Sequence, residues 1–150
     1  MEIERKFLIT SPEQFPFDPK EFSSRQIEQG YLCISPVVRI RRDNDDYFLT
    51  YKSKGLMVRE EYNLPLTAEA YAHLRAKADG RIITKTRYVI PLENGLTLEL
   101  DIFHSDLAPL ILAEIEFPDE QSARAYQPPR WLGEDVTFST EYHNSTLSKI

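Results

Sequence analysis

Hydrophobic and polar residues alternate along most of this 150-residue chain with a period of two. Such alternation is typical of β-strands, because successive side chains of a strand point to opposite faces. The pattern predicts eight strands, near residues 1–9, 26–34, 37–43, 46–53, 57–65, 82–91, 96–103 and 110–118. The turn residues of segment 43–46 and the Asn94-Gly95 pair separate neighbouring strands, which favours antiparallel hairpins.

Helices are predicted at only two places. One begins at the capping residue Thr67 and runs through TAEAYAHLRAKAD to Gly80, and a shorter one begins at Asp119 and stops before Pro128. The segment after Trp131 reads as a short extended piece followed by a turn or a terminal helix, and we assign no role to His143 within it. Eight antiparallel strands with so few helices fit a β-sandwich or a closed barrel.

Length and composition limit the class of protein. A chain of 150 residues predicts one domain over 1–150, and 41% hydrophobic with 28% charged residues is ordinary for a soluble globular protein. No apolar run reaches the roughly 18 residues that a membrane helix needs. The charged start MEIERKFLIT and the single cysteine favour a cytoplasmic protein. The net charge of −6 argues against nucleic acid as a partner.

The charged residues of the strands fall on one face and separate by sign. The last two predicted strands carry only acids on this face, whereas strands 37–43, 46–53 and 82–91 carry only bases. On a single strand such a face would ordinarily meet solvent. Here a closed barrel with these faces inward would have an acidic wall opposite a basic wall. The acids are Glu2, Glu4, Glu61, Glu99, Asp101, Glu114 and Glu116, and the bases are Lys6, Arg39, Arg41, Lys52, Arg59, Lys85 and Arg87.

The two walls point to one kind of ligand. Hard divalent cations such as Mg²⁺ and Mn²⁺ prefer carboxylate oxygens, whereas arginine and lysine bind phosphate oxygens. A polyphosphate with bound metal would neutralise both walls of the lumen. The five glycines are scattered along the chain, which excludes a glycine-rich phosphate loop.

Several motifs in this order resemble the CYTH superfamily, the triphosphate tunnel metalloenzymes, and above all its short bacterial members. They are Glu2-x-Glu4-x-Lys6, Gln29-Gly30-Tyr31-Leu32, Arg39-Ile40-Arg41, Thr50-Tyr51-Lys52-Ser53, Lys85-Thr86-Arg87-Tyr88 and the acidic pairs Glu99/Asp101 and Glu114/Glu116. The resemblance implies an α+β fold in which an eight-stranded closed antiparallel β-barrel, with a few flanking helices, binds a triphosphate with Mg²⁺ or Mn²⁺.

The resemblance also implies roles for individual residues. Lys6 as a general base, through a pKa that neighbouring cations lower, and Tyr31 as its contact are hypotheses, and Glu61 is expected to hold a second metal or to position water. Asn63 departs from the acidic pair usual in that strand and weakens the expectation of two metals. The expected metal ligands are Glu2, Glu4, Glu61, Asp101, Glu114 and Glu116, and the expected substrate ligands are Lys6, Arg39, Arg41, Lys52, Lys85 and Arg87, joined by Arg59 from the same inward face.

The favoured function is metal-dependent hydrolysis of inorganic tripolyphosphate, with nucleoside triphosphates as poorer substrates, since the inward faces offer no aromatic pocket for a base. Thiamine triphosphate is a further candidate substrate. The main alternative is a CYTH-type adenylate cyclase that makes cyclic AMP from ATP. A non-catalytic polyphosphate-binding module is the third, disfavoured because the acids are retained. A homodimer is compatible with the family, although the pattern shows no interface.

Overall fold

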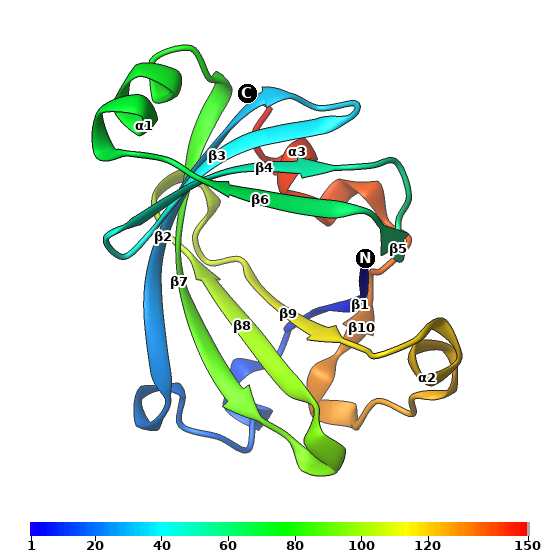
Figure 1. Cartoon of the computed structure of the whole chain (residues 1–150). Coiled ribbons are helices and arrows are strands. Elements are labelled where there is room, and N and C mark those ends of the chain that lie inside the picture. The colour runs from blue at the N-terminus through cyan, green and yellow to red at the C-terminus, as the bar shows by residue number, and fades with distance from the viewer. Residues whose placement is uncertain (150) are drawn as a thin grey trace.

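The computed structural model describes residues 1–149, and its strands form one antiparallel sheet that curls into a nearly closed barrel (Figure 1). The order of the main path is β10-β1-β9-β8-β7-β2-β3-β4-β6, and β5 pairs with β1. This confirms the predicted barrel. The strands are β1 (Glu2–Leu8), β2 (Ser23–Cys33), β3 (Val37–Asp43), β4 (Asp46–Lys52), β5 (Val58–Arg59), β6 (Glu61–Pro65), β7 (Asp79–Pro91), β8 (Thr97–Phe103), β9 (Ile111–Glu116) and β10 (Glu134–Asp135).

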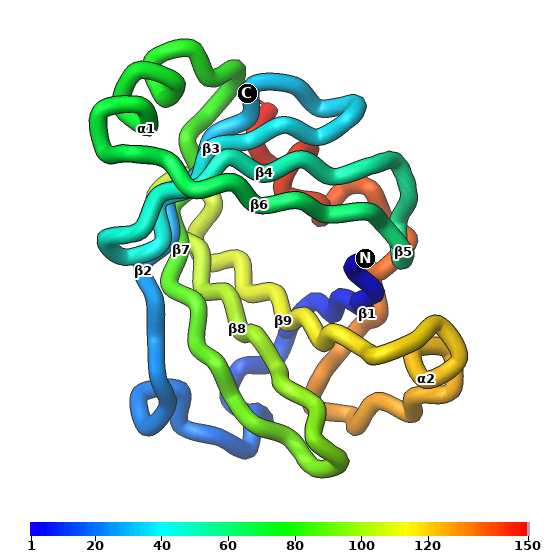
Figure 2. Tube along the Cα trace, in the orientation of Figure 1, coloured from blue at the N-terminus to red at the C-terminus, as the bar shows by residue number. Residues whose placement is uncertain are grey.

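The predicted strand at 57–65 was wrong as one element, because the chain breaks at Glu60 into β5 and β6. β5 pairs with β1, with Glu2 opposite Arg59, whereas β6 pairs with β4, with Glu61 opposite Lys52. In Figure 2 the trace of β5 meets the first residues of β1 beside the N-terminus. The break therefore lets residues 58–65 pair with both β1 and β4. Because the period-two alternation continues across Glu60, the sequence did not reveal the break.

The helices are α1 (Ala68–Arg75), α2 (Glu120–Ala125) and α3 (Asn144–Leu147). Both predicted N-caps are confirmed: the Thr67 hydroxyl accepts from the Ala70 N–H at 3.1 Å, and the Asp119 carboxylate accepts from the Ser122 N–H at 2.6 Å. The first helix ends earlier than predicted. Gly80 belongs to β7, and its φ of +68° brings the backbone so close to the Ser148 carbonyl that a side chain would collide with it.

Apolar residues seal one end of the barrel. Toward this end the inward-facing positions change from charged to apolar, as at Tyr31, Val37 and Leu112, and these side chains form a buried cluster. Val136, Tyr142 and Leu147 from the C-terminal segment pack onto the same cluster. Burial of this apolar surface holds the C-terminal segment in place. The interior of the barrel is therefore a cup with a closed floor.

The first helix docks on the outside of the barrel through one half-buried acid. The Glu28 carboxylate accepts hydrogen bonds from the Tyr71 hydroxyl and the Arg75 guanidinium, both at 2.8 Å. Burial opposes ionisation of Glu28, but these two bonds outweigh it and hold the pKa of Glu28 below its usual value. The charged carboxylate therefore helps to fix α1 to β2.

We expect Glu28→Gln to lower the free energy of unfolding at pH 7 by about 1 kcal/mol or less, because the pair is partly exposed. A folded-state pKa below the unfolded value gives stability that is present above the unfolded pKa, near 4.5, and is lost as the pH falls. Urea unfolding at several pH values measures the difference. The two proteins should converge below pH 4.5, and a constant difference would contradict the assignment.

Within residues 1–149, no helix has the length and apolar character needed to cross a membrane.

Candidate active site

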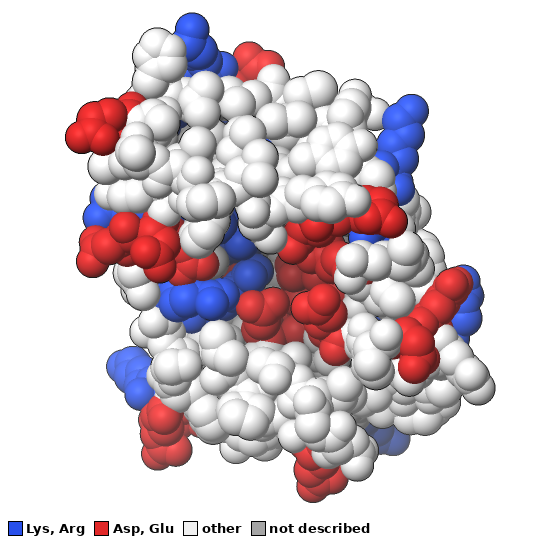
Figure 3. Space-filling view, in the orientation of Figure 1, with Lys and Arg blue, Asp and Glu red and all other residues white. Residues whose placement is uncertain are grey.

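The barrel encloses one strongly polar cavity of about 210 Å³. Figure 3 shows its mouth as a hollow with basic side chains along one border and acidic side chains along the other. The acidic and basic walls predicted from the sequence therefore face a common space. The cavity is lined by Glu2, Glu4, Lys6, Tyr31, Val37, Arg39, Arg41, Lys52, Arg59, Glu61, Asn63, Arg87, Glu99, Glu114, Glu116, His143, Asn144 and Ser145.

The acidic wall comes from β1, β8 and β9, whose register places charged residues opposite one another. Glu4 lies opposite Glu116, and Lys6 lies opposite Glu114. Burial, followed by the charges of Glu114 and Glu2, raises the pKa of Glu4 well above its usual value. Burial and the neighbouring acids also raise the pKa of Glu116. Without a bound cation the wall therefore resists full ionisation.

Glu114 behaves oppositely because bases surround it. Burial opposes its ionisation, but the charges of Lys6, Arg87 and Lys85 outweigh burial and hold its pKa well below the usual value. The Lys6 ammonium lies 3.6 Å from the Glu114 carboxylate. Glu114 is thus the ionised partner beside a Glu4 that tends to keep its proton.

Two predicted site residues lie below the cavity lining. Asp101 is buried in a bidentate pair with Arg87, with bonds of 2.8 and 2.9 Å, and its other close neighbour is the Lys85 ammonium at 2.8 Å. Burial, helped by the charges of Arg87 and Arg41, lowers the pKa of Lys85 to about 7 despite Asp101. Arg87 reaches the lining, whereas Asp101 and Lys85 support it from beneath.

The basic wall contains guanidinium groups without acidic partners. Arg39 and Arg59 line the cavity, and neither forms an ion pair with a carboxylate among residues 1–149. Arg39 is buried, and its Nε has no hydrogen-bond partner in that part of the chain. Arg41 donates to the Gln29 amide oxygen at 2.7 and 2.9 Å, and burial with the nearby charges of Arg39 and Arg87 lowers its pKa to about 9. These cations are available to an anion.

Lys52 belongs to the basic wall and contacts two residues of the acidic wall. Its ammonium donates to Glu2 at 3.0 Å and lies 3.2 Å from Glu61. Burial opposes ionisation of Glu61, but Lys52 and hydrogen bonds from Glu2 and Asn63 lower its pKa to about 2. Asn63 also accepts from the Thr50 hydroxyl at 2.6 Å, so its amide oxygen is already used.

The C-terminal segment contributes three lining residues that the sequence interpretation missed. His143, Asn144 and Ser145 lie at the closed end of the cavity. Burial, then the charge of Lys6, lowers the pKa of His143. The Asn144 amide oxygen lies 3.4 Å from the Lys85 ammonium. No strand alternation covers this segment, so its contribution depends on long-range packing.

A divalent cation fits the acidic wall in a limited way. Among residues 1–149, no three carboxylate, imidazole or thiolate groups converge in a ready coordination shell. Mg²⁺ commonly uses one or two carboxylates and completes its shell with water and phosphate oxygens. The carboxylates of Glu4 and Glu114, which repel each other, and of Glu116, which lies opposite Glu4 and is repelled by Glu2, meet that requirement. The donor set therefore suits a metal that arrives with a phosphate ligand.

Comparisons with known proteins agree with this geometry. Inorganic triphosphatases from Nitrosomonas europaea and Acetivibrio thermocellus are 39% and 37% identical to this chain, over 98% and 99% of it and 96% and 93% of their own lengths. The crystal structure of the inorganic triphosphatase NE1496 superposes with a TM-score of 0.71 at 37% identity, covering 99% of this chain and 94% of that one. The CYTH domain model matches residues 1–150, and the chain belongs to the CYTH domain family.

Proposed function

We propose that this protein is a metal-dependent hydrolase of inorganic tripolyphosphate that works as one tunnel domain over residues 1–150. The observation that carries the proposal is the basic wall: Arg39, which is buried, and Arg59, which is half-buried, reach the cavity without acidic partners among residues 1–149. Unpaired buried guanidinium groups are costly, and a polyanion offsets that cost. The relatives named inorganic triphosphatase support the same substrate.

We assign the metal, Mg²⁺ or Mn²⁺, to the acidic wall, with Glu4, Glu114 and Glu116 as its main ligands and Glu2 beside them. When bound, such a cation neutralises phosphate oxygens and lowers the pKa of bound water. Glu61 is already paired with Lys52 and Asn63. We therefore assign it to positioning water rather than to holding a second metal. Asp101 acts by orienting Arg87 rather than as a direct ligand.

The residues of the chain bind the substrate and stabilise its charge. Arg39, Arg41 and Arg87 hold phosphate oxygens through charge-assisted hydrogen bonds, which are stronger than those between neutral groups. The Lys6 ammonium, 3.6 Å from Glu114, must lose its proton before it can act as the base. Its neutral Nζ would then take a proton from the attacking water, while Tyr31 limits where that side chain moves. Water adds to the terminal phosphorus, the bond to the bridging oxygen breaks, and the products are pyrophosphate and phosphate.

The size of the cavity favours a small polyanion over a nucleotide. Its volume of about 210 Å³ is below the roughly 300–1,000 Å³ typical of sites that enclose drug-sized ligands. The lining is almost entirely polar and has no aromatic surface broad enough to stack a base. A nucleoside would remain outside the mouth, so we expect ATP to be the poorer substrate.

The proposal is tested by turnover of purified protein with tripolyphosphate, ATP or thiamine triphosphate, each with Mg²⁺, Mn²⁺ or a chelator. We expect phosphate and pyrophosphate from tripolyphosphate. Its kcat/KM should be at least about tenfold above that for ATP, because the nucleoside of ATP gains no contacts inside the cavity. Chelation should stop the reaction. Release of cyclic AMP with pyrophosphate would support a cyclase, and tight binding without turnover would support a binding module.

A further inference from the structure

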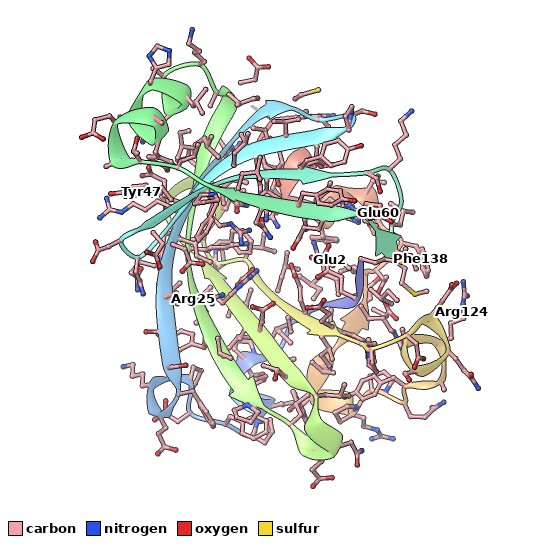
Figure 4. All side chains as sticks on the ribbon, viewed as in Figure 1. Glu2, Arg25, Tyr47, Glu60, Arg124 and Phe138 are labelled. Atoms are coloured by element: carbon pink, nitrogen blue, oxygen red, sulfur yellow. The ribbon has the colours of Figure 1, made fainter. Side chains whose placement is uncertain are left out.

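Arg25 lies at the mouth of the cup, outside the residues that line the cavity. It stands on β2 directly opposite Arg87 of β7, so both side chains leave the sheet on its inner face. Figure 4 labels Arg25 at the inner side of β2, beside β7 and β8. Its side chain is 39% exposed, against 7% for Arg87. Arg25 is thus a rim continuation of the basic wall.

A carboxylate oxygen marks an anion position between these two arginines. The Oε2 atom of Glu99 lies 3.4 Å from Arg25 Nη2 and 3.2 Å from Arg87 Nη1. On its other side Arg25 Nε lies 3.2 Å from the Asp43 carboxylate. Two guanidinium groups that converge on one oxygen can accept a phosphate oxygen in its place.

The closed floor determines which phosphate would reach this position. The apolar cluster with Val136, Tyr142 and Leu147 blocks the far end, so a linear polyphosphate enters and leaves by one mouth. The buried cations Arg39, Arg41 and Arg87 surround the part that lies inside the cavity. A chain longer than three phosphates must extend past the rim.

We propose that Arg25 binds the phosphate of a linear polyphosphate that protrudes beyond those held in the cavity, so that the protein binds longer polyphosphates end-on. This inference rests on the proposed function for the class of ligand. On binding, the outer phosphate displaces Glu99 from the position between Arg25 and Arg87. Arg25 therefore distinguishes chains by length and contributes little to tripolyphosphate.

The test compares equilibrium binding of tripolyphosphate and linear tetrapolyphosphate by calorimetry, with and without Mg²⁺. Arg25→Ala should raise Kd for tetrapolyphosphate about threefold to tenfold, the range for a charged contact partly screened by solvent. Kd for tripolyphosphate should change less than about twofold on the same reasoning. Arg25→Lys should recover part of the loss, because it keeps the charge without the fork.

Two further variants separate a direct contact from a structural effect. Asp43→Asn releases Arg25 from a competing carboxylate and should strengthen binding of tetrapolyphosphate alone. Arg42→Ala removes an exposed charge of the same kind from β3, where it pairs with Asp45 at 3.6 Å, and should change neither Kd. Circular dichroism checks folding, and Arg25→Gln replaces the alanine variant should that one unfold.

Equal losses for both ligands, no loss for either, or weaker binding in Asp43→Asn would overturn the role of Arg25. Turnover assays on the same samples address the proposed function separately. A wild-type protein that binds both polyphosphates but hydrolyses neither would reject hydrolysis while the comparison of binding still decides the role of Arg25.

Discussion

Replacing Glu4 with glutamine should reduce metal-dependent turnover of tripolyphosphate about a hundredfold to a thousandfold. This is the usual cost of removing one preorganised electrostatic contact in an active site. Glu4 is buried between Glu2 and Glu114 on the acidic wall, and glutamine has the same shape without the charge that attracts a divalent cation. The loss should be smaller in binding of tripolyphosphate without metal, because the basic wall is intact. Steady-state rates at several Mg²⁺ concentrations measure the effect.

The same substitution should leave the fold intact or make it more stable. The folded-state pKa of Glu4 is raised above its unfolded value, so the stability from its protonated form is present at low pH and is lost as the pH rises through the folded pKa. Glutamine stays neutral, so the advantage of Glu4→Gln in a chelator should grow with pH. Glu60→Gln makes the same change outside the barrel, at a residue labelled in Figure 4, and should alter neither activity nor stability. Full activity in Glu4→Gln would refute the acidic wall as the metal site.

Much of this site followed from the sequence because a strand carries its own geometry. The alternation predicted which side chains share a face of each strand, and the sign of their charges predicted whether that face belongs to the acidic or the basic wall. That reasoning located Glu4, Arg39 and Glu114 around one space, where the structure also finds them. Alternation could not predict how far along the barrel axis each inward-facing side chain lies, because it shows only which face of the strand a residue is on. Asp101 and Lys85 therefore looked like lining residues, although they pair beneath the surface of the cavity.

The rest depended on contacts between distant segments. β5 and β6 separate at Glu60 because β5 pairs with β1 at the other end of the sheet, and local alternation carries no signal for that choice. His143 lines the closed end because Val136, Tyr142 and Leu147 pack onto the apolar floor. Short, irregular segments of this kind take their conformation from the surface they cover, and their own sequence leaves it open.

Arg39→Met should separate function from stability in the basic wall. The Arg39 guanidinium is buried and its Nε has no partner among residues 1–149, so it has no carboxylate to lose on replacement. Methionine fills a similar volume without a charge to desolvate, and such replacements are often neutral or stabilising. We expect the Tm of the substrate-free protein to stay the same or rise, while kcat/KM for tripolyphosphate falls about a hundredfold to a thousandfold.

Arg87→Met is the matched control, because it makes the same substitution at a guanidinium that has a buried partner. Arg87 holds Asp101 by two bonds of 2.8 and 2.9 Å, so its loss leaves an acid facing Lys85 alone and should cost about 3–5 kcal/mol of stability. Thermal unfolding and steady-state kinetics of both variants decide the matter. A large drop in Tm for Arg39→Met would mean that Arg39 supports the fold, and unchanged kcat/KM would remove it from the substrate site. The opposed responses of two arginines that line the same cavity would establish that the barrel keeps some of its buried charges at the expense of stability, because the polyphosphate needs them.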